Sequence, residues 1–388
     1  MKTLGLLLTS PKEVGGIYQY SISMIDACNF LQKKTGYNVI YFYSDDIWKK
    51  HIPKKSNKIF IKKNFLNRLI TKLINPILPS VFYDKYLAKI FNDEVITINK
   101  SNCDLIILPS QNRTCYQIEK RNITSVHDLM HRYRPKFSEF SKTIIVDRDL
   151  HYSKISKFAT GIFVDSKLGG KQLMNLYNTN RNKVFVLPFA PPKYLHKSKK
   201  YNLKKKFNIK NKYIFYPAQF WEHKNHINLI KAFKKVKKKN KNILLVFCGA
   251  KKNYFNKVKN YVENNCLKKS VFFLGRVDDK YMYSLYNKAE MTVYPSFFGP
   301  TNIPPLEALL CKSPLICSDV FAMKEQVGNA SLYFNPREFA EISKKITLLL
   351  NNTALRKKLI INGNKIIKKY NQIHFNKLFL KYVKKSLS

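Results

Sequence analysis

Acidic residues are scarce in this sequence, which has 24 Asp and Glu against 71 Lys and Arg and a formal net charge of +47. No acidic residue lies between Asp46 and Asp84. Such an excess suits a nucleic-acid partner or an anionic membrane surface. The lysines are spread along the whole chain, however, which favours a general coding bias as the largest contribution and argues against nucleic acid.

Long apolar runs and closely spaced cysteines are also missing. No apolar run approaches the roughly 18 residues of a membrane-spanning helix. Residues 1–9 are too short an apolar stretch for a signal peptide and lack a small-residue cleavage site, so they predict a first strand. None of the seven cysteines forms a Cys-x-x-Cys pair, so we expect reduced thiols in a cytoplasmic protein.

Apolar segments typical of buried strands alternate with helical patterns in two series, and 388 residues are enough for two packed cores. This alternation predicts an α/β protein with two doubly wound, Rossmann-like domains. The expected strands are residues 2–9, 38–43, 104–108, 123–126, 161–165 and 184–187 in the first series, then 213–216, 243–249, 271–274, 291–294 and 315–317 in the second.

A loop rich in Gly, Pro and Asn follows residues 291–294 and leads into a helix near Pro304. Adjacent prolines are tolerated in a first helical turn, and Thr301 or Asn302 can cap it. A loop that opens a helix at a strand's end directs N–H groups at a phosphate or a sugar hydroxyl. Glu307, in the opening turns, either meets such a ligand or serves only the helix dipole.

Two further candidates follow strands of the first series. Gly16, after Gly15, lets the backbone approach a phosphate without an intervening side chain. His127 lies at the carboxyl end of residues 123–126, where open α/β sheets bind ligands. The alternatives are an ordinary turn glycine and a hydrogen-bonded loop histidine.

The stretch Phe65–Ile74 has the pattern of a basic amphipathic helix. Its apolar residues fall on one helical face, and Arg68 and Lys72 lie among the polar ones. Such a helix can lie in a membrane interface. The alternative is a helix that packs its apolar face on the core and exposes its basic face to water.

Taken in order, the motifs resemble those of retaining glycosyltransferases of the GT-B fold, family 4, over nearly the whole chain. They are Gly15-Gly16, residues 127–129, 164–166, 188–191, 216–226, 273–277, Pro295-Ser296 and residues 304–308. The resemblance implies two Rossmann-like domains that face each other across a cleft. We expect an acceptor-side domain at residues 1–190, a nucleotide-sugar domain at 191–368 and a C-terminal helix at 369–388 that crosses back to the first domain.

The resemblance also implies roles for individual residues. The catalytic candidates are His127, which would contact the transferred sugar, and Glu307, which would accept hydrogen bonds from the ribose. The other expected contacts are Gly16, Lys224, Gln219 and Arg276 for the donor diphosphate, Val277 for the base, and Gly299, Pro300, Thr301, Asn302 and Ile303 for the sugar and β-phosphate.

Two positions depart from the family pattern. Gly299 stands where the family often has a first glutamate, eight positions before Glu307, and a glycine has no side chain to accept a bond from a sugar hydroxyl. Gln219 stands in place of an arginine beside Lys224, so neutralisation of the diphosphate would depend on Lys224, Arg276 or another cation. Both departures bear on which donor is used.

The implied reaction is retaining transfer of a hexose-type sugar, without a cofactor, from a nucleotide diphosphate, with UDP or GDP favoured over dTDP. We expect no metal, because Asp45-Asp46 and Asp278-Asp279 look like turn or capping residues rather than diphosphate chelators. The expected acceptor is a glycan or a lipid-linked glycan, as in O-antigen, capsule or lipopolysaccharide synthesis, at the inner face of the cytoplasmic membrane. The alternatives are a non-enzymatic nucleic-acid- or membrane-binding protein and a GT-B sugar-nucleotide epimerase.

Overall fold

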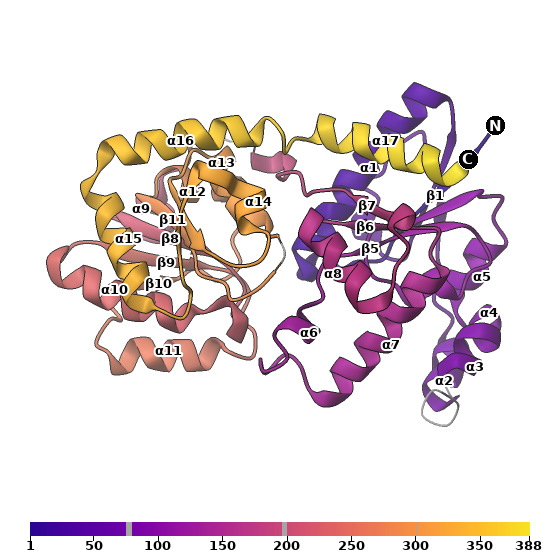
Figure 1. Cartoon of the computed structure of the whole chain (residues 1–388), viewed down its shortest axis with the longest axis horizontal. Coiled ribbons are helices and arrows are strands. Elements are labelled where there is room, and N and C mark those ends of the chain that lie inside the picture. Colours follow the sequence, from indigo (N-terminus) through magenta and orange to yellow (C-terminus); the bar gives the residue numbers. More distant parts are fainter. Residues whose placement is uncertain (75–79, 196–199, 300) are drawn as a thin grey trace. The chain divides into compact units, whose positions relative to one another are not determined.

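The computed structural model describes residues 1–74, 80–195, 200–299 and 301–388 and divides the chain into two units (Figure 1). Unit 1 comprises Met1–Leu129, Thr143–Pro188 and Gln372–Ser388, and unit 2 comprises Met130–Lys142 and Phe189–Asn371. Residues 130–142, which the sequence placed in the first domain, therefore group with unit 2. Their contacts explain the difference, because Phe137 and Glu139 pack on unit 2 side chains.

Unit 1 contains a seven-stranded parallel sheet in the order β3-β2-β1-β4-β5-β6-β7. Its strands are β1 (Thr3–Leu8), β2 (Asn38–Tyr43), β3 (Asn57–Phe60), β4 (Leu105–Leu108), β5 (Asn122–Val126), β6 (Gly161–Val164) and β7 (Val184–Val186). Its helices are α1 (Gly16–Thr35), α2 (Phe65–Ile74), α3 (Ser80–Phe82), the π-helical turn η3 (Tyr83–Leu87), α4 (Ala88–Phe91), α5 (Asp93–Asn99), α7 (Lys142–Phe158), α8 (Lys167–Tyr177) and α17 (Gln372–Leu387). Lys142, the first residue of α7, groups with unit 2.

Unit 2 contains a six-stranded parallel sheet in the order β10-β9-β8-β11-β12-β13. Its strands are β8 (Tyr213–Pro217), β9 (Leu244–Cys248), β10 (Val271–Phe273), β11 (Met291–Tyr294), β12 (Leu315–Ser318) and β13 (Ser331–Phe334). Its helices are α6 (Met130–Tyr133), α9 (Leu203–Phe207), α10 (His226–Lys239), α11 (Phe255–Asn264), α12 (Asp279–Asn287), α13 (Ile303–Leu310), α14 (Met323–Val327), α15 (Phe339–Asn351) and α16 (Thr353–Ile367), with 3₁₀ turns η6 (Lys193–Leu195) and η7 (Glu222–Lys224) near the site.

Both sheets reverse their strand order at one point, between β1 and β4 in unit 1 and between β8 and β11 in unit 2. The strands there are mostly apolar, as expected of parallel strands covered on both faces, and each residue of β4, β8 and β11 is buried. A crevice at the carboxyl ends of such strands is where doubly wound sheets bind ligands. The candidate residues that follow β8 and β11 are therefore placed by topology.

The C-terminal stretch ends in two helices, α16 and α17. α16 ends at Ile367, and α17 begins at Gln372 within unit 1, where it packs on α1. Phe375 and Phe379 are buried there, and Tyr382 stacks on Phe185 with ring centroids 4.7 Å apart. Apolar and aromatic contacts thus hold α17 on unit 1.

All seven cysteines are free thiols, as expected, and only Cys266 is exposed. Within the described residues, every helix is too short or too polar to cross a bilayer.

Candidate functional site

Lys224 ends η7, in the loop that leads from β8 to α10. The Tyr216 hydroxyl donates to its carbonyl oxygen (2.7 Å). The next residue, Asn225, takes a left-handed conformation (φ 60°), and its amide donates to the carbonyl oxygens of Pro295 (2.9 Å) and Pro336 (2.8 Å). These bonds, together with those from the Lys224 and Asn225 N–H groups to Trp221 and Glu222, fix the backbone that carries Lys224.

The Lys224 ammonium points to the start of α13. It donates to the Tyr294 hydroxyl (3.0 Å) and to the Asn302 Oδ1 (3.3 Å), and the Tyr294 hydroxyl donates to the same Oδ1 (2.8 Å). Asn302 directly precedes α13, and its own backbone is held by Gln326, which accepts from its N–H (3.1 Å) and donates to its carbonyl (2.8 Å). These contacts place a cation beside a helix N-terminus, a combination that favours a phosphate.

The expected capping of α13 by Thr301 or Asn302 is wrong. Asn302 occupies the N-cap position, but its side chain makes no capping hydrogen bond because it binds Lys224 and Tyr294 instead. The Thr301 hydroxyl is buried and has no partner among the described residues. A buried hydroxyl without a partner costs free energy, so a ligand that bonds to it would recover that cost.

The prolines of the first turn limit what α13 can offer a ligand. Pro304 and Pro305 carry no N–H, so the amide donors at this end come from the preceding loop and Ile303. Pro300, which the sequence included in the sugar loop, lies outside the described residues. An anion at this position would therefore rely on Lys224 and the Thr301 hydroxyl beside those amides.

Gly299 has a φ of 111°, a conformation that residues with a Cβ rarely adopt. A Cβ there would lie 2.7 Å from the Asn302 Nδ2 and 3.0 Å from its Oδ1. Any side chain at this position would therefore displace the amide that holds Lys224. This geometry explains why a glutamate does not fit at residue 299 in this chain.

Glu307 lies in the second turn of α13 and is only 6% exposed. Its carboxylate accepts hydrogen bonds from the hydroxyls of Tyr286 in α12 (2.6 Å) and Tyr194 in η6 (3.1 Å). Burial raises the pKa of Glu307, although the two tyrosine hydrogen bonds partly offset that effect. Each carboxylate oxygen keeps a second lone pair, so Glu307 can still accept a bond from a ribose hydroxyl.

Glu307 and Lys224 share one neighbour, Tyr294. Burial raises the pKa of Tyr294, and the Glu307 charge raises it further, while the Tyr294 hydroxyl accepts from Lys224. The structure thus brings Lys224, Thr301, Asn302, Ile303 and Glu307 to one end of one helix.

Residues 130–142 hold the loop between β11 and α13 from one side. The His223 Nδ1 bonds to the Glu139 Oε1 (2.9 Å), and the His223 ring stacks on Phe298 with centroids 3.8 Å apart. The His223 carbonyl accepts from the Phe297 N–H (2.8 Å), and Phe137 packs on both phenylalanines. This packing fixes the start of the loop that reaches Gly299.

The remaining unit 2 candidates follow neighbouring strands at the same edge. Gln219 follows β8, and its Oε1 accepts from the Trp221 indole (2.9 Å). Arg276 and Val277 follow β10, and Val277 packs against the core of unit 2. Parallel strands end at one edge, so these residues share the edge of Lys224, but their expected contacts with a donor stay predictions.

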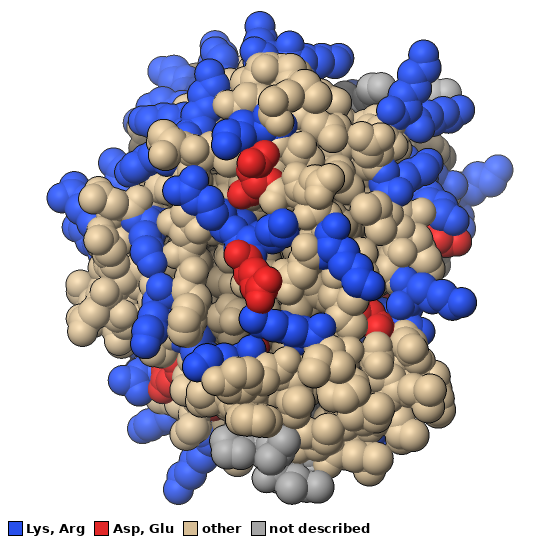
Figure 2. Space-filling model, turned by 90° about the vertical axis from the view of Figure 1, so that its right-hand side faces the viewer, with Lys and Arg blue, Asp and Glu red and all other residues tan. Residues whose placement is uncertain are grey.

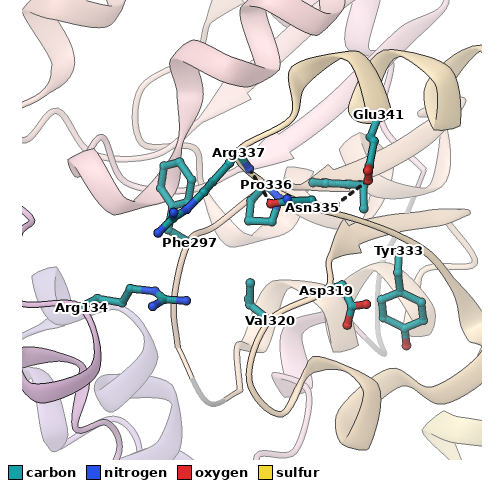
Figure 3. A pocket seen from close by; sticks show the side chains of 10 residues that line it. Arg134, Phe297, Asp319, Val320, Tyr333, Asn335, Pro336, Arg337 and Glu341 are labelled. Carbon is teal, nitrogen blue, oxygen red and sulfur yellow. Dashed lines mark hydrogen bonds between the residues drawn. The ribbon is translucent and has the colours of Figure 1, made fainter.

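A hollow of about 500 Å³ opens beside this loop (Figure 3). Phe297 and Arg337 lie on one side of it and Asp319 and Tyr333 on the other, so it joins an aromatic ring to charges of both signs. Lys224 and Glu307 are not among its lining residues, so this hollow is separate from the N-terminal end of α13 that Lys224 faces. The full lining is Arg134, Phe297, Asp319, Val320, Tyr333, Phe334, Asn335, Pro336, Arg337 and Glu341.

In unit 1, His127 follows β5 as expected, and both of its ring nitrogens are engaged. Nδ1 lies 3.1 Å from the Asp165 Oδ1 and Nε2 lies 2.9 Å from the Pro109 carbonyl oxygen. Both partners accept, so the arrangement suits a protonated imidazole. Burial lowers the pKa of His127, but the Asp165 charge and the hydrogen bonds outweigh it and leave the pKa above its ordinary value.

The other unit 1 candidate, Gly16, is the first residue of α1, behind Gly15 (φ 63°). The helix therefore begins directly at the turn that follows β1, where the sequence predicted an approach to phosphate. A role for Gly16 in binding stays a prediction.

Among the described residues, no group of three or more His, Cys, Asp or Glu side chains could hold a metal ion. Asp45 caps the 3₁₀ turn Asp46–Trp48 by accepting from the Ile47 N–H (2.9 Å), as expected. Asp278 occupies the N-cap position of α12, but its side chain makes no capping hydrogen bond.

Comparisons with known proteins agree with this description. Residues 197–366 match the family model described as glycosyl transferases group 1. The chain is 25% identical over 247 residues to O-antigen chain mannosyltransferase B of Escherichia coli, covering 61% of this chain and 63% of that protein. It is 34% identical over 162 residues to O-antigen chain mannosyltransferase RfbU of Salmonella typhimurium, covering 41% and 42%. Both matches thus span less than two thirds of the relatives' own length.

Among solved structures, Anabaena HepE in complex with UDP and glucose matches with a TM-score of 0.74 at 14% identity, over 99% of this chain and 100% of that one. The two parallel sheets and this likeness define a protein of the GT-B fold, as the sequence predicted. The family match covers residues 197–366, which form most of unit 2.

Several residues of the site carry no signal of their own in the sequence. Tyr286 precedes Glu307 by 21 residues and Tyr194 by 113, and neither lies in a family motif. Tyr294, the last residue of β11, reads simply as part of a buried strand. In a chain with 24 tyrosines, nothing singles these three out before the fold is known.

Proposed function

We propose that this protein is a retaining glycosyltransferase that moves a hexose from a nucleotide diphosphate sugar to a growing bacterial surface glycan. The family of residues 197–366 supports glycosyl transfer, and the names of the two O-antigen relatives favour a mannosyl donor. A UDP- or GDP-linked donor fits the proposal.

The observation that carries this proposal is the end of α13. The Lys224 ammonium, the loop amides and the Thr301 hydroxyl, which has no partner among the described residues, meet at this end, and Glu307 lies in the second turn of the helix. A donor bound there would place its ribose against Glu307 and its leaving phosphate against Lys224. Fixed donors at a developing negative charge lower a barrier without reorganisation.

The proposed step breaks the bond between the sugar C1 and the phosphate oxygen and forms a bond from C1 to an acceptor hydroxyl oxygen. The departing diphosphate takes the electron pair, and the acceptor's proton passes to an oxygen of that phosphate on the same face. No protein carboxylate is needed as nucleophile. In this scheme Lys224 stabilises the leaving group, and His127, whose Nδ1 lies 3.1 Å from the Asp165 Oδ1, contacts the transferred sugar without removing a proton.

We further propose a lipid-linked acceptor, which would place the protein on the inner face of the cytoplasmic membrane. The support is the O-antigen role in the names of both relatives and the basic character of the chain.

The test is incubation of the purified chain with UDP- and GDP-hexoses, with and without a lipid-linked glycan extract, while free nucleotide is measured. We expect nucleotide release with one donor, dependent on acceptor, and none from Lys224→Met. Release without acceptor, or conversion of the donor's sugar into its epimer, would indicate a hydrolase or an epimerase instead.

Two further measurements address the stereochemistry and the metal. The anomeric configuration of the product, read by NMR, should equal that of the donor. Transfer should continue in excess EDTA, because the proposed site neutralises the diphosphate with Lys224 and amides. Inversion at C1, or full loss of transfer in EDTA that Mg²⁺ restores, would contradict the corresponding part of the proposal.

A further inference from the structure

The segment from β3 to α4 exposes an unusual share of the apolar surface. Of the 17 large apolar side chains that the described residues expose, nine lie between residues 60 and 90. Eight of these form the group that we call the α2–α4 patch: Phe65, Leu66, Leu69 and Leu73 in α2, with Val81, Phe82, Tyr86 and Ile90. Contiguous apolar surface of this kind usually marks a binding surface.

Helix α2 does not cover a core. None of its ten residues is buried, and Phe65 is 73% exposed. It meets the protein along a mixed side, where the Asn67 amide donates to Asp93 (2.6 Å) and the Thr71 hydroxyl bonds to that of Tyr83 (2.9 Å), with Ile70 and Ile74 half-buried beside them. The alternative that α2 packs its apolar face on the core is therefore wrong.

Basic side chains accompany the patch, while the nearby carboxylates are already occupied. The exposed bases are Lys62, Lys63, Arg68, Lys72 and Lys85, together with Lys89, which pairs with Glu119 (2.5 Å). Asp84 is buried, where it accepts from Lys154 (2.5 Å) and Gln117 (2.7 Å). Asp93 accepts from the Asn64 N–H and the Asn67 amide. The surface around the patch therefore carries a net positive charge.

Figure 2 shows how this end of unit 1 differs from the rest of the same face. Lys and Arg are scattered over most of the view, but the lower end, beside residues that are not described, is largely apolar or uncharged. An apolar area bordered by bases fits the interfacial zone of an anionic bilayer, where leucines enter the acyl boundary and lysines stay at the headgroups.

We propose that the α2–α4 patch docks unit 1 onto an anionic lipid bilayer, with α2 lying in the plane of the interface. The ten residues of α2 span about 15 Å, which is too short to cross a bilayer but enough to lie in its surface. The patch belongs entirely to unit 1. The inference shares with the proposed function only the location of the acceptor, and lipid binding can be measured without any donor.

The test is cosedimentation of the full chain with vesicles of phosphatidylcholine and phosphatidylglycerol in equal parts, and with phosphatidylcholine vesicles alone. We expect binding to the mixed vesicles. Phe65→Ser with Leu69→Ser should weaken it roughly a hundredfold, and Arg68→Glu with Lys72→Glu roughly tenfold or more. These side chains are exposed, so the melting temperature should stay unchanged.

Matched controls lie in unit 2. Leu348→Ser with Ile361→Ser removes two exposed apolar side chains, and Lys357→Glu with Lys358→Glu makes the same change in net charge on α16. Both should bind vesicles as the parent does. Equal losses in the control and patch variants would show that overall charge or apolarity acts rather than α2–α4, and would overturn the proposal.

A fluorescence readout separates insertion from simple adsorption. Phe65→Trp should shift its emission to the blue on mixed vesicles, whereas Ile361→Trp should not. The proposal fails if the parent ignores both vesicle types, or if it forms a dimer in solution that Phe65→Ser with Leu69→Ser dissociates, since the patch would then bind a second copy. Nucleotide release measured on the same variants with a short water-soluble acceptor should persist, which distinguishes loss of docking from loss of catalysis.

Discussion

The two sheets have the same parallel order around one reversal, yet their carboxyl edges carry different chemistry. In unit 2 a lysine, a buried glutamate and a hydroxyl without a partner among the described residues gather at one helix end. In unit 1 the corresponding edge presents a histidine with both ring nitrogens already bonded. The shared fold puts loops at the same edge of each sheet, and the side chains of those loops make the two edges chemically different.

The comparison predicts that substitutions in unit 2 affect donor binding, whereas substitutions in unit 1 affect pH dependence and acceptor use. Five changes test this division, from the largest expected effect to the smallest.

Lys224→Met should lower kcat/KM about a thousandfold, because it removes the cation that faces the leaving phosphate. The measurement is acceptor-dependent nucleotide release under initial-rate conditions. Lys238→Met, on the exposed side of α10, is the control and should leave the rate unchanged. Equal activity of the two variants would remove Lys224 from the mechanism.

Glu307→Gln should weaken donor binding about a hundredfold, since an amide accepts a ribose hydrogen bond less well than a carboxylate.

The same substitution should leave folding stability equal or higher. Burial raises the pKa of Glu307 in the folded state, so ionisation of this carboxyl costs stability above its unfolded pKa, and that cost disappears as the pH falls. The variant should therefore melt no lower than the parent at pH 7, with a gap that narrows toward pH 4; a lower melting temperature at pH 7 would speak against this reading.

Gly299→Ala should lower activity by about tenfold or more and destabilise the fold by roughly 1–3 kcal/mol, because a Cβ at φ 111° is strained and meets Asn302. Adding Asn302→Ala should remove the collision but not the strain. Asn302→Ala should therefore cost less stability in the Gly299→Ala variant than in the parent protein. Independent, additive losses from thermal melts would show that the two residues do not interact.

Thr301→Val should weaken donor binding about tenfold while leaving stability equal or higher. The hydroxyl is buried and unpartnered among the described residues, so a methyl group in its place removes a desolvation cost. Ser296→Ala is the contrasting control, because that hydroxyl donates to the Phe298 carbonyl (2.8 Å) and its loss should destabilise. The relevant data are donor titrations by thermal shift for both variants.

Asp165→Asn should have the smallest effect near pH 6 and a growing one at higher pH. Asp165 raises the pKa of His127, so the stability that the charged pair contributes is complete below the unfolded pKa of histidine and is lost as the pH rises through the folded value. In the variant, the pH at which this stability is lost should be lower than in the parent, by a several-fold change in proton concentration. Any decline in transfer that is linked to it should shift in the same direction. Donor affinity should not change; if it fell as far as in Lys224→Met, the contrast between the two edges would be lost.

The order of strands and helices could be predicted because apolar runs and turn residues mark each element locally. The short strands β3 and β13 were missed, since Asn57–Phe60 is mostly exposed and Ser331–Phe334 has two half-buried residues. The position of Lys224 near α13 also followed from motifs, since β8 and β11 are neighbours in any sheet of this order.

What could not be predicted depends on side chains that meet across long distances. The pattern of α2 gave its two faces but not which one meets the protein, because the partners of Asn67 and Thr71 lie on other elements. The capping prediction at Asn302 failed for a similar reason: the local rule is correct, but Lys224, 78 residues away, competes for the same oxygen.

The crossing of α17 has a consequence for biosynthesis. Unit 1 gains Phe375, Phe379 and Val383 from residues 372–388, so its apolar core stays incomplete while the ribosome makes all of unit 2. Residues 189–371 can fold as they emerge from the ribosome. Unit 1, in contrast, lacks α17 until residues 372–388 have been synthesised, and until then α1 stays uncovered. Nascent chains stalled before residue 372 should therefore occupy chaperones through their first half rather than their second.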